Sequence, residues 1–204
     1  MTLEMIVVPI ASYILGGIPS GYLIAKYTKN IDIRKHGSGN PGAANVYRTV
    51  GKWAGWATLT ADAAKGFIPV FYASKAFPGD YKMAMLCGAL AIVGHVWTVF
   101  LGFKGGKGVA TSAGVFGALL PIPTLSAFVI FVIAVAASGH ISIGSMSAAV
   151  ILPIISFWAG IYPKPISFTA LIVCLLILYT HIPNLKRILA GHELEFKDGS
   201  QPRK

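Results

Sequence analysis

Long apolar segments separated by short polar loops constrain this chain more than any other feature of its sequence. Of the 204 residues, 55% are hydrophobic and only 12% are charged, against about 25% charged in an ordinary soluble domain. A membrane-crossing helix needs about 20 apolar residues. We therefore expect an all-α polytopic membrane protein with about seven transmembrane helices, one of them short. The expected spans are residues 5–27, 53–77, 82–100, 109–120, 121–138, 148–161 and 166–179.

Glycine and proline mark the places where these helices bend or stop. The run from 109 to 138 is too long for one span, and Pro121-Ile122-Pro123 divides it, because proline removes a backbone donor and clashes with the preceding turn. In the first span Gly16, Gly17, Pro19 and Gly21 predict a bend or a close helix contact near Ser20.

The charge distribution predicts the orientation in the membrane. The net charge is +10, which could indicate nucleic-acid binding, but the basic residues lie in loops between apolar runs, as the positive-inside bias predicts. Seven spans place the loop at 28–52, the loop at 102–108, the turn at 140–145 and the tail on one side, the cytoplasm. A chain with six spans would weaken this asymmetry. The expected cytoplasmic cations are Lys26, Lys29, Arg34, Lys35, Arg48, Lys52, Lys104, Lys107, Lys186, Arg187, Lys197, Arg203 and Lys204, against Lys75, Lys82 and Lys164 on the other side.

The sequence predicts one integral-membrane domain over residues 1–204, with 181–204 as a cytoplasmic tail. The first apolar run lacks a basic leader and a small-residue cleavage site, so we expect it to be retained as a span. Cys87 and Cys174 lie within apolar runs, where they predict core packing and neither a disulfide nor a metal site.

The first polar loop contains the stretch Gly37-Ser38-Gly39-Asn40-Pro41-Gly42-Ala43-Ala44-Asn45-Val46-Tyr47-Arg48. Glycines allow close approach to a ligand and can turn N–H groups toward an anion, and arginine can bind phosphate through two parallel hydrogen bonds. The spacing GxGxxG could indicate a dinucleotide site, but that motif requires a preceding strand, and here an apolar span precedes it. We therefore predict half of a phosphate-binding site at a membrane surface.

The second polar loop is Gly102-Phe103-Lys104-Gly105-Gly106-Lys107-Gly108. It is not a phosphate-binding P-loop, because Leu101 replaces the first glycine and Gly108 replaces the serine or threonine after the lysine. It precedes a predicted helix at Val109, and helix N-termini attract anions. Thr111 and Ser112 could add hydroxyl donors. A purely topological role for the two lysines is the alternative.

Two further groups of polar residues are candidates for function. Asp62 and Lys65 lie three residues apart on one face of the second span; charges at membrane depth are costly and mark function by default, although a self-neutralising structural pair is the alternative. Near the tail stand His181, Asn184, Arg187 and Glu193, where Pro183 predicts a helix that places Asn184 and Arg187 one turn apart. His95 and His140 lack the spacing of a metal site.

Taken together, these motifs resemble the bacterial integral-membrane glycerol-3-phosphate acyltransferases that take the acyl group from acyl phosphate. The resemblance covers nearly the whole chain. It is carried by the loops at 37–48, 102–111 and 181–193, by Asp62 with Lys65-Gly66, and by Ser142. One departure is Thr180, where the family often has arginine. The family is distinct from acyltransferases with an HxxxxD box, and in this chain no histidine is followed five residues later by aspartate.

The resemblance implies that acyl phosphate acylates the 1-hydroxyl of sn-glycerol 3-phosphate, giving lysophosphatidic acid and phosphate, the first step of bacterial phospholipid synthesis. It implies an enzyme of the bacterial inner membrane whose site faces the cytoplasm, with no cofactor, metal or nucleic-acid partner. A monomer is compatible with the sequence, which leaves the oligomeric state open. The expected catalytic residues are His181, Ser38 and Asn184. The expected substrate-binding residues are Gly37, Gly39, Asn40, Asn45, Arg48, Asp62, Lys65, Lys104, Gly105, Gly106, Lys107, Gly108, Thr111, Ser142, Arg187 and Glu193.

Two other classes of function compete with this interpretation. A small transporter of phosphorylated solutes would also show glycine-broken spans and intramembrane charge, but no inverted repeat is evident. A phosphotransferase acting on CDP-linked lipids would need closely spaced aspartates, which are absent from the sequence. The general base is left open between His181 and an oxygen of a substrate phosphate, and so is the assignment of each loop to a phosphate.

Overall fold

The protein is built from helices, and residues 2–196, which the computed structural model describes, contain no β-strand. This confirms the predicted all-α class. The α-helices in chain order are α1 (Glu4–Gly17), α2 (Ser20–Lys29), α3 (Ala43–Thr49), α4 (Lys52–Ala76), α5 (Tyr81–Val96), α6 (Val109–Leu119), α7 (Pro121–Ser138), α8 (Ile141–Ala159), α9 (Lys164–Thr180) and α10 (Ile182–Leu189). Two short 3₁₀ helices, η1 (Ile33–Lys35) and η2 (Val99–Leu101), lie in the first and second polar loops.

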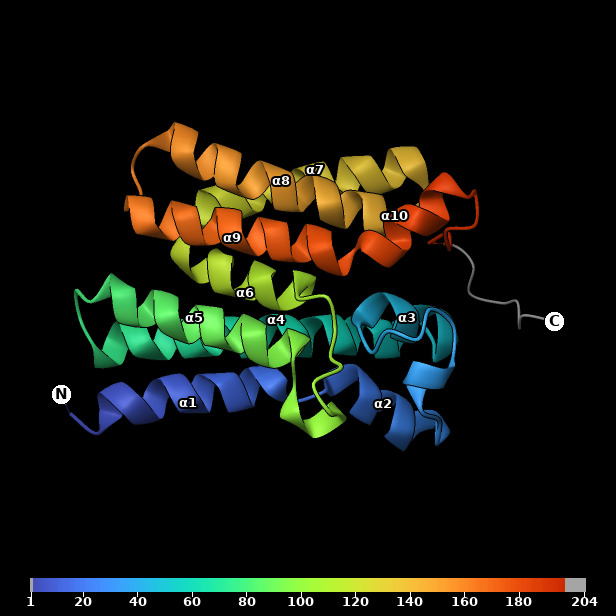
Figure 1. The fold of residues 1–204 in the computed structure, drawn as a ribbon, viewed down its shortest axis with the longest axis horizontal. Coiled ribbons are helices and arrows are strands. Elements are labelled where there is room, and N and C mark those ends of the chain that lie inside the picture. Colours follow the sequence, from blue (N-terminus) through green and yellow to red (C-terminus); the bar gives the residue numbers. More distant parts are fainter. Residues whose placement is uncertain (1, 197–204) are drawn as a thin grey trace.

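The long helices lie side by side and bring the polar loops to one end of the molecule (Figure 1). That end holds α2, α3, α10 and the loop before α6, while the N-terminus and the α4–α5 and α8–α9 turns lie at the opposite end. We call the end formed by residues 28–52, 97–108, 139–140 and 181–196 the polar end. The predicted tail begins there, although its residues 197–204 lie outside the described part of the chain.

Four helical segments are long and apolar enough to cross a membrane: residues 4–29, 81–101, 121–138 and 141–159. A fifth results if α9 and α10, which meet at 51°, are counted as one span. The helix α6 has 11 residues, about 16 Å at 1.5 Å per residue, roughly half of the hydrocarbon thickness. The apolar helices confirm a polytopic membrane protein, and the count of seven spans stays a prediction.

Helix boundaries follow local sequence signals. Asp80 caps α5 by accepting hydrogen bonds from the N–H groups of Lys82 and Met83, both at 3.1 Å, as an N-cap carboxylate does. Pro121 begins α7, where the missing N–H costs nothing. The first predicted span is divided at Ile18-Pro19 into α1 and α2. Hydropathy did not predict α3 within the first polar loop, because its helix is short and mostly small residues.

Close packing between helices requires glycine at several positions. A Cβ on Gly66 of α4 would lie 2.1 Å from the carbonyl oxygen of Thr111, and one on Gly114 of α6 would lie 1.9 Å from that of Ala63. Small residues let membrane helices approach in this way. The helices α4 and α6 therefore pack backbone to backbone, and α6 carries the second polar loop at its N-terminus.

Candidate active site

The first polar loop is organised around the buried side chain of Asn45, on α3. Its amide nitrogen donates to the carbonyl oxygens of His36 (2.9 Å), Asn40 (3.0 Å) and Ile33 (3.3 Å), and its oxygen accepts from the N–H of Ser38 at 2.9 Å. The side chain is 2% exposed. Asn45 thus uses its hydrogen-bonding groups to hold the loop, and it presents Ser38 and Asn40 to the neighbouring cavity.

The second polar loop is attached to the C-terminal end of α5. The N–H of Gly105 donates to the carbonyl of Val96 at 3.0 Å, and the N–H of Gly106 donates to that of His95 at 3.1 Å. Gly105 and Gly106 were predicted to bind substrate, and their N–H groups have partners within the protein. Gly108 has a φ of +84°, which favours glycine, and it is the residue from which α6 begins.

Beside this loop, one connected group of polar side chains joins the second and third motifs. Lys107 Nζ donates to Asn184 Oδ1; Asn184 Nδ2 donates to Glu193 Oε1 at 2.5 Å; and Arg187 Nε donates to Glu193 Oε2 at 2.8 Å. We call Lys107, Asn184, Arg187 and Glu193 the outer cluster. It joins residues 77 positions apart, so only the fold brings them together.

The charges of the outer cluster shift its pKa values. Burial, aided by the charges of Arg187 and Arg48, lowers the pKa of the Lys107 ammonium to about 8. Burial alone would raise the pKa of the Glu193 carboxyl, but hydrogen bonds from Asn184 and Arg187, with the charge of Arg187, hold it below its usual value. Near neutral pH the cluster therefore carries two cations and one carboxylate.

His181 and Thr180 lie where α9 meets α10. His181 is 3% exposed, and its Nδ1 lies 2.8 Å from the carbonyl oxygen of Ile177. That carbonyl can only accept, so Nδ1 carries the proton of a neutral ring and Nε2 keeps its lone pair. The hydroxyl of Thr180, the departure from the family pattern, lies 2.9 Å from the carbonyl oxygen of Ile177 and 3.1 Å from that of Lys107, so its one proton is shared between them. The threonine therefore fastens α9 to the second polar loop.

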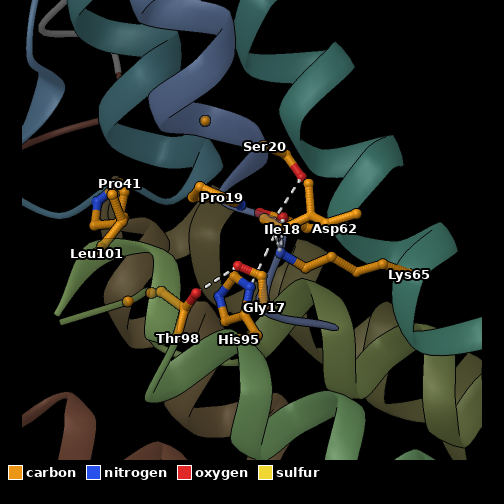
Figure 2. Close-up of a pocket in the computed structure, with 13 residues that line it drawn as sticks. Gly17, Ile18, Pro19, Ser20, Pro41, Asp62, Lys65, His95, Thr98 and Leu101 are labelled. Carbon is orange, nitrogen blue, oxygen red and sulfur yellow. Dashed lines mark hydrogen bonds and ion pairs between the residues drawn. The ribbon is translucent and has the colours of Figure 1, made fainter. Parts of the chain in front are cut away.

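A second charged group lies deeper, among α4, α5 and the α1–α2 break (Figure 2). Lys65 Nζ lies 2.8 Å from Asp62 Oδ1 and donates to the carbonyl of Ile18 at 2.7 Å. His95 Nδ1 lies 3.8 Å from the same carboxylate oxygen. We call Asp62, Lys65 and His95 the inner cluster; all three are at least 92% buried. The predicted pair of Asp62 and Lys65 thus forms, with His95 beside it.

A cavity of about 240 Å³ opens between the two clusters. Its polar side has hydroxyl, amide, imidazole and cationic groups, and its apolar side comes from α4, α7, the start of α8 and the segment after α10. The polar side includes Ser38, Asn40, Arg48, Lys107, Ser142, His181, Asn184 and Glu193, and the apolar side includes Trp56, Leu59, Phe131, Val135, Ile141, Leu194 and Phe196. The cavity can therefore hold a ligand with one anionic end and one apolar end.

The structure brings most of the predicted site residues to this cavity. Asn45, Asp62 and Gly108 also line it, and Arg187 adjoins it through Glu193. Other predicted residues lie elsewhere: Lys65 in the inner cluster, Thr111 buried in α6, and Lys104 exposed at the surface. Gly37, Gly39, Gly105 and Gly106 shape the two loops without lining the cavity. Their contact with substrate stays a prediction.

Sequence reasoning missed the apolar part of the cavity lining and the place of His95 beside Asp62 and Lys65. Trp56, Leu59, Phe131 and Val135 lie within apolar runs, where a cavity-lining side chain looks like any lipid-facing one. The one signal for this part of the lining in the sequence was an aromatic residue, Trp56, close to the start of a predicted span. In the structure Trp56 is 60% exposed. Among residues 2–196, no three histidine, cysteine or acidic side chains are grouped so that they could hold a metal ion.

The fold defines a polytopic membrane protein, and its cavity is lined by cationic, neutral polar and apolar side chains. A family model described as glycerol-3-phosphate acyltransferase matches residues 6–191. The chain is 47% identical over 184 residues to the glycerol-3-phosphate acyltransferase of Endomicrobium trichonymphae, covering 90% of this chain and 92% of that one. It is 43% identical over 195 residues to that of Geobacter sulfurreducens, covering 95% and 98%. The chain belongs to the glycerol-3-phosphate acyltransferase family.

Two solved structures share the fold. One is PlsY (YgiH), an integral membrane glycerol 3-phosphate acyltransferase, in its glycerol 3-phosphate form, with a TM-score of 0.89, 38% identity, and 94% and 95% of the two chains covered. The lysophosphatidic acid form gives a TM-score of 0.87 and covers 96% of each chain. The protein is therefore an integral-membrane acyltransferase of phospholipid biosynthesis. The transporter and phosphotransferase alternatives give way to this assignment.

Proposed function

We propose that the protein transfers an acyl group from acyl phosphate to the 1-hydroxyl of sn-glycerol 3-phosphate, giving lysophosphatidic acid and inorganic phosphate. The observation that carries the proposal is the cavity lining, which combines the cations Arg48 and Lys107 with apolar side chains such as Phe131. Both substrates carry phosphate and one carries a long acyl chain. Solved relatives in glycerol 3-phosphate and lysophosphatidic acid forms support the same acceptor and product.

In the proposed reaction the glycerol oxygen attacks the carbonyl carbon of the acyl phosphate. A new C–O ester bond forms, the carbonyl becomes a tetrahedral oxyanion, and the bond to the phosphate oxygen then breaks. The anhydride is already activated, so no covalent enzyme intermediate is needed. Preorganised donors stabilise the oxyanion and hold the partners in contact. Ser38, Asn40 and Asn184 are among the neutral donors that the cavity offers for this task.

The hydroxyl proton has two acceptors in this scheme. One is Nε2 of His181, whose Nδ1 is held by Ile177, and the other is an oxygen of the departing phosphate. If the histidine is the base, His181→Ala lowers kcat by about 10²–10⁴-fold. His181→Asn keeps a hydrogen-bond donor and cannot take the proton. A substantial kcat in His181→Asn, with the pH profile of the original protein, assigns the proton to the phosphate.

We further propose that the whole chain acts as a single domain in the bacterial inner membrane, with the polar end in the cytoplasm. The described basic residues gather at that end, whereas Lys75, Lys82 and Lys164 lie near the opposite helix ends. This asymmetry is what the positive-inside rule expects. The cavity is lined by residues of this chain, and we propose that the enzyme acts as a monomer.

The donor is tested with purified protein incubated with glycerol 3-phosphate and either acyl phosphate or the matching acyl-CoA, without added metal. We expect phosphate release and lysophosphatidic acid in equal amounts, from acyl phosphate alone. Equal turnover with acyl-CoA would contradict the proposed donor and leave the acceptor in place.

A further inference from the structure

We propose that His95 is a positioning residue: it supports the loop that carries Lys107, and the Asp62–Lys65 pair braces it from behind. The charged pair would then act on the reaction through the histidine and the loop, although Asp62 and His95 also reach the wall of the cavity. The kinetic part of the proposal rests on the proposed function, and the structural part can be tested without it.

The first step is the contact between the loop and the ring. A Cβ placed on Gly106 would lie 2.2 Å from His95 Nε2 and 2.8 Å from its Cε1. The N–H of Gly106 also donates to the carbonyl oxygen of His95 at 3.1 Å. The backbone at Gly106 thus lies against the Nε2 edge of the His95 ring and is hydrogen-bonded to the carbonyl group of the same residue.

The second step is the support on the other side of the ring. His95 is 8% exposed, and its Nδ1 lies 3.8 Å from Asp62 Oδ1. The same oxygen lies 2.8 Å from Lys65 Nζ, and Figure 2 shows the three side chains converging. The ring is therefore confined between the loop and a carboxylate that a lysine holds in place.

The third step ties this arrangement to the α1–α2 break. Lys65 Nζ donates to the carbonyl of Ile18 at 2.7 Å, and Thr98 Oγ1 donates to that of Gly17 at 2.6 Å. Both carbonyls lie where a helix ends and lack a partner within it. Thr98 also accepts from the N–H of Phe100 at 3.2 Å. The start of the second loop and the inner cluster are therefore anchored to two adjacent carbonyls, those of Gly17 and Ile18.

The consequence falls on Lys107, which directly follows Gly106 in the chain. Its ammonium reaches Asn184 of the outer cluster, and it lines the cavity. A displacement of about 1 Å in a positioned group can reduce turnover by about 10²-fold. The inner cluster thus fixes the position of Lys107 in the outer cluster.

The geometry offers a matched pair of glycines for the test. Gly106→Ala places its methyl group against the imidazole, so removing the ring with His95→Ala should relieve the clash. Gly105→Ala places its methyl group 2.0 Å from the backbone carbonyl of His95, which the same change leaves in place. Gly105→Ala is therefore the control that must not be rescued.

We expect each single variant, Gly106→Ala and His95→Ala, to lower kcat/KM by roughly 10–100-fold, mainly by raising KM. If the two effects were independent, kcat/KM of the double variant would fall by the product of the two single factors. Because the two residues are in contact, we expect kcat/KM of the double variant to be at least about tenfold higher than that product predicts. Additive effects, or equal rescue of Gly105→Ala, would overturn the proposal. A fall in kcat with unchanged KM would assign His95 to the chemistry.

Hydrogen exchange gives a readout that does not depend on acyl transfer. In His95→Ala the amides of residues 102–108 should exchange at least about tenfold faster, because the bonds from Gly105 and Gly106 open more often. The turn at residues 139–140 serves as the internal control and should not change. Unchanged exchange in the loop refutes the support role, even if the protein turns out to have another substrate.

Discussion

The inner and outer clusters each contain a lysine followed by glycine, yet the two lysines are used differently. Lys65 is 5% exposed and is held by a carboxylate and a carbonyl. Lys107 is half-buried and donates to a neutral amide, and within residues 2–196 it forms no ion pair. The comparison teaches that a charge neutralised inside the protein is part of the framework, whereas a charge ordered beside a cavity remains available to an anionic ligand.

Removing one partner of the inner pair should have the largest effect. Lys65→Met leaves Asp62 buried without its cation, and breaking a buried pair costs about 3–5 kcal/mol of unfolding free energy. Thermal unfolding in detergent measures the loss. The double variant Asp62→Asn/Lys65→Met should recover most of it, and Lys107→Met should cost far less. An unchanged melting temperature in Lys65→Met would contradict the conclusion that the inner lysine, unlike the outer one, stabilises the fold.

Changing the shape of a cavity cation while keeping its charge should have the next largest effect. Arg48 lines the cavity, and lysine cannot reproduce the planar fork of a guanidinium. A hydrogen bond to a charged group contributes about 1.5–3 kcal/mol, so Arg48→Lys should lower kcat/KM by roughly 10–100-fold. Unaltered kinetics, with an unaltered melting temperature, would assign Arg48 to topology alone.

The pH dependence of kcat/KM should report Lys107. Its pKa is lowered to about 8. The side chain therefore carries a positive charge below that pH and loses this charge as the pH rises through it. Since kcat/KM reports the free enzyme, it should fall by about tenfold per pH unit above 8. Lys107→Arg removes this fall, because guanidinium stays protonated. An identical profile in both proteins would show that another group titrates.

The smallest effect should come from Lys104, in the same loop. It is exposed and lies outside the cavity lining, so Lys104→Gln should change kcat/KM by less than about twofold, as surface substitutions usually do. Lys107→Gln, measured in parallel, is the matched comparison. A large loss in Lys104→Gln would restore the substrate-binding role that the sequence predicts for it.

Local signals in the sequence were sufficient for most of the fold. Predicted helix limits at 53–77 and 166–179 differ from α4 and α9 by one or two residues, and the break at Pro121 separates α6 from α7. Pro183 indicated a helix after the last span, which is α10. Hydropathy and the effects of proline depend on residues that are close in sequence, so these features can be predicted from the sequence alone. The division of α1 from α2 was visible only as a cluster of glycine and proline.

The sequence by itself determined that this is a helical membrane protein, and its three polar motifs identified the residue types of an anion site. Only the tertiary structure decided that Asn45 and Gly105 hold loops, that Lys65 is neutralised, and that Lys107 meets Asn184 across 77 residues. The physical reason is that a polar group serves a ligand only if no protein group already satisfies it. That depends on contacts between distant segments, which spacing along the chain does not specify.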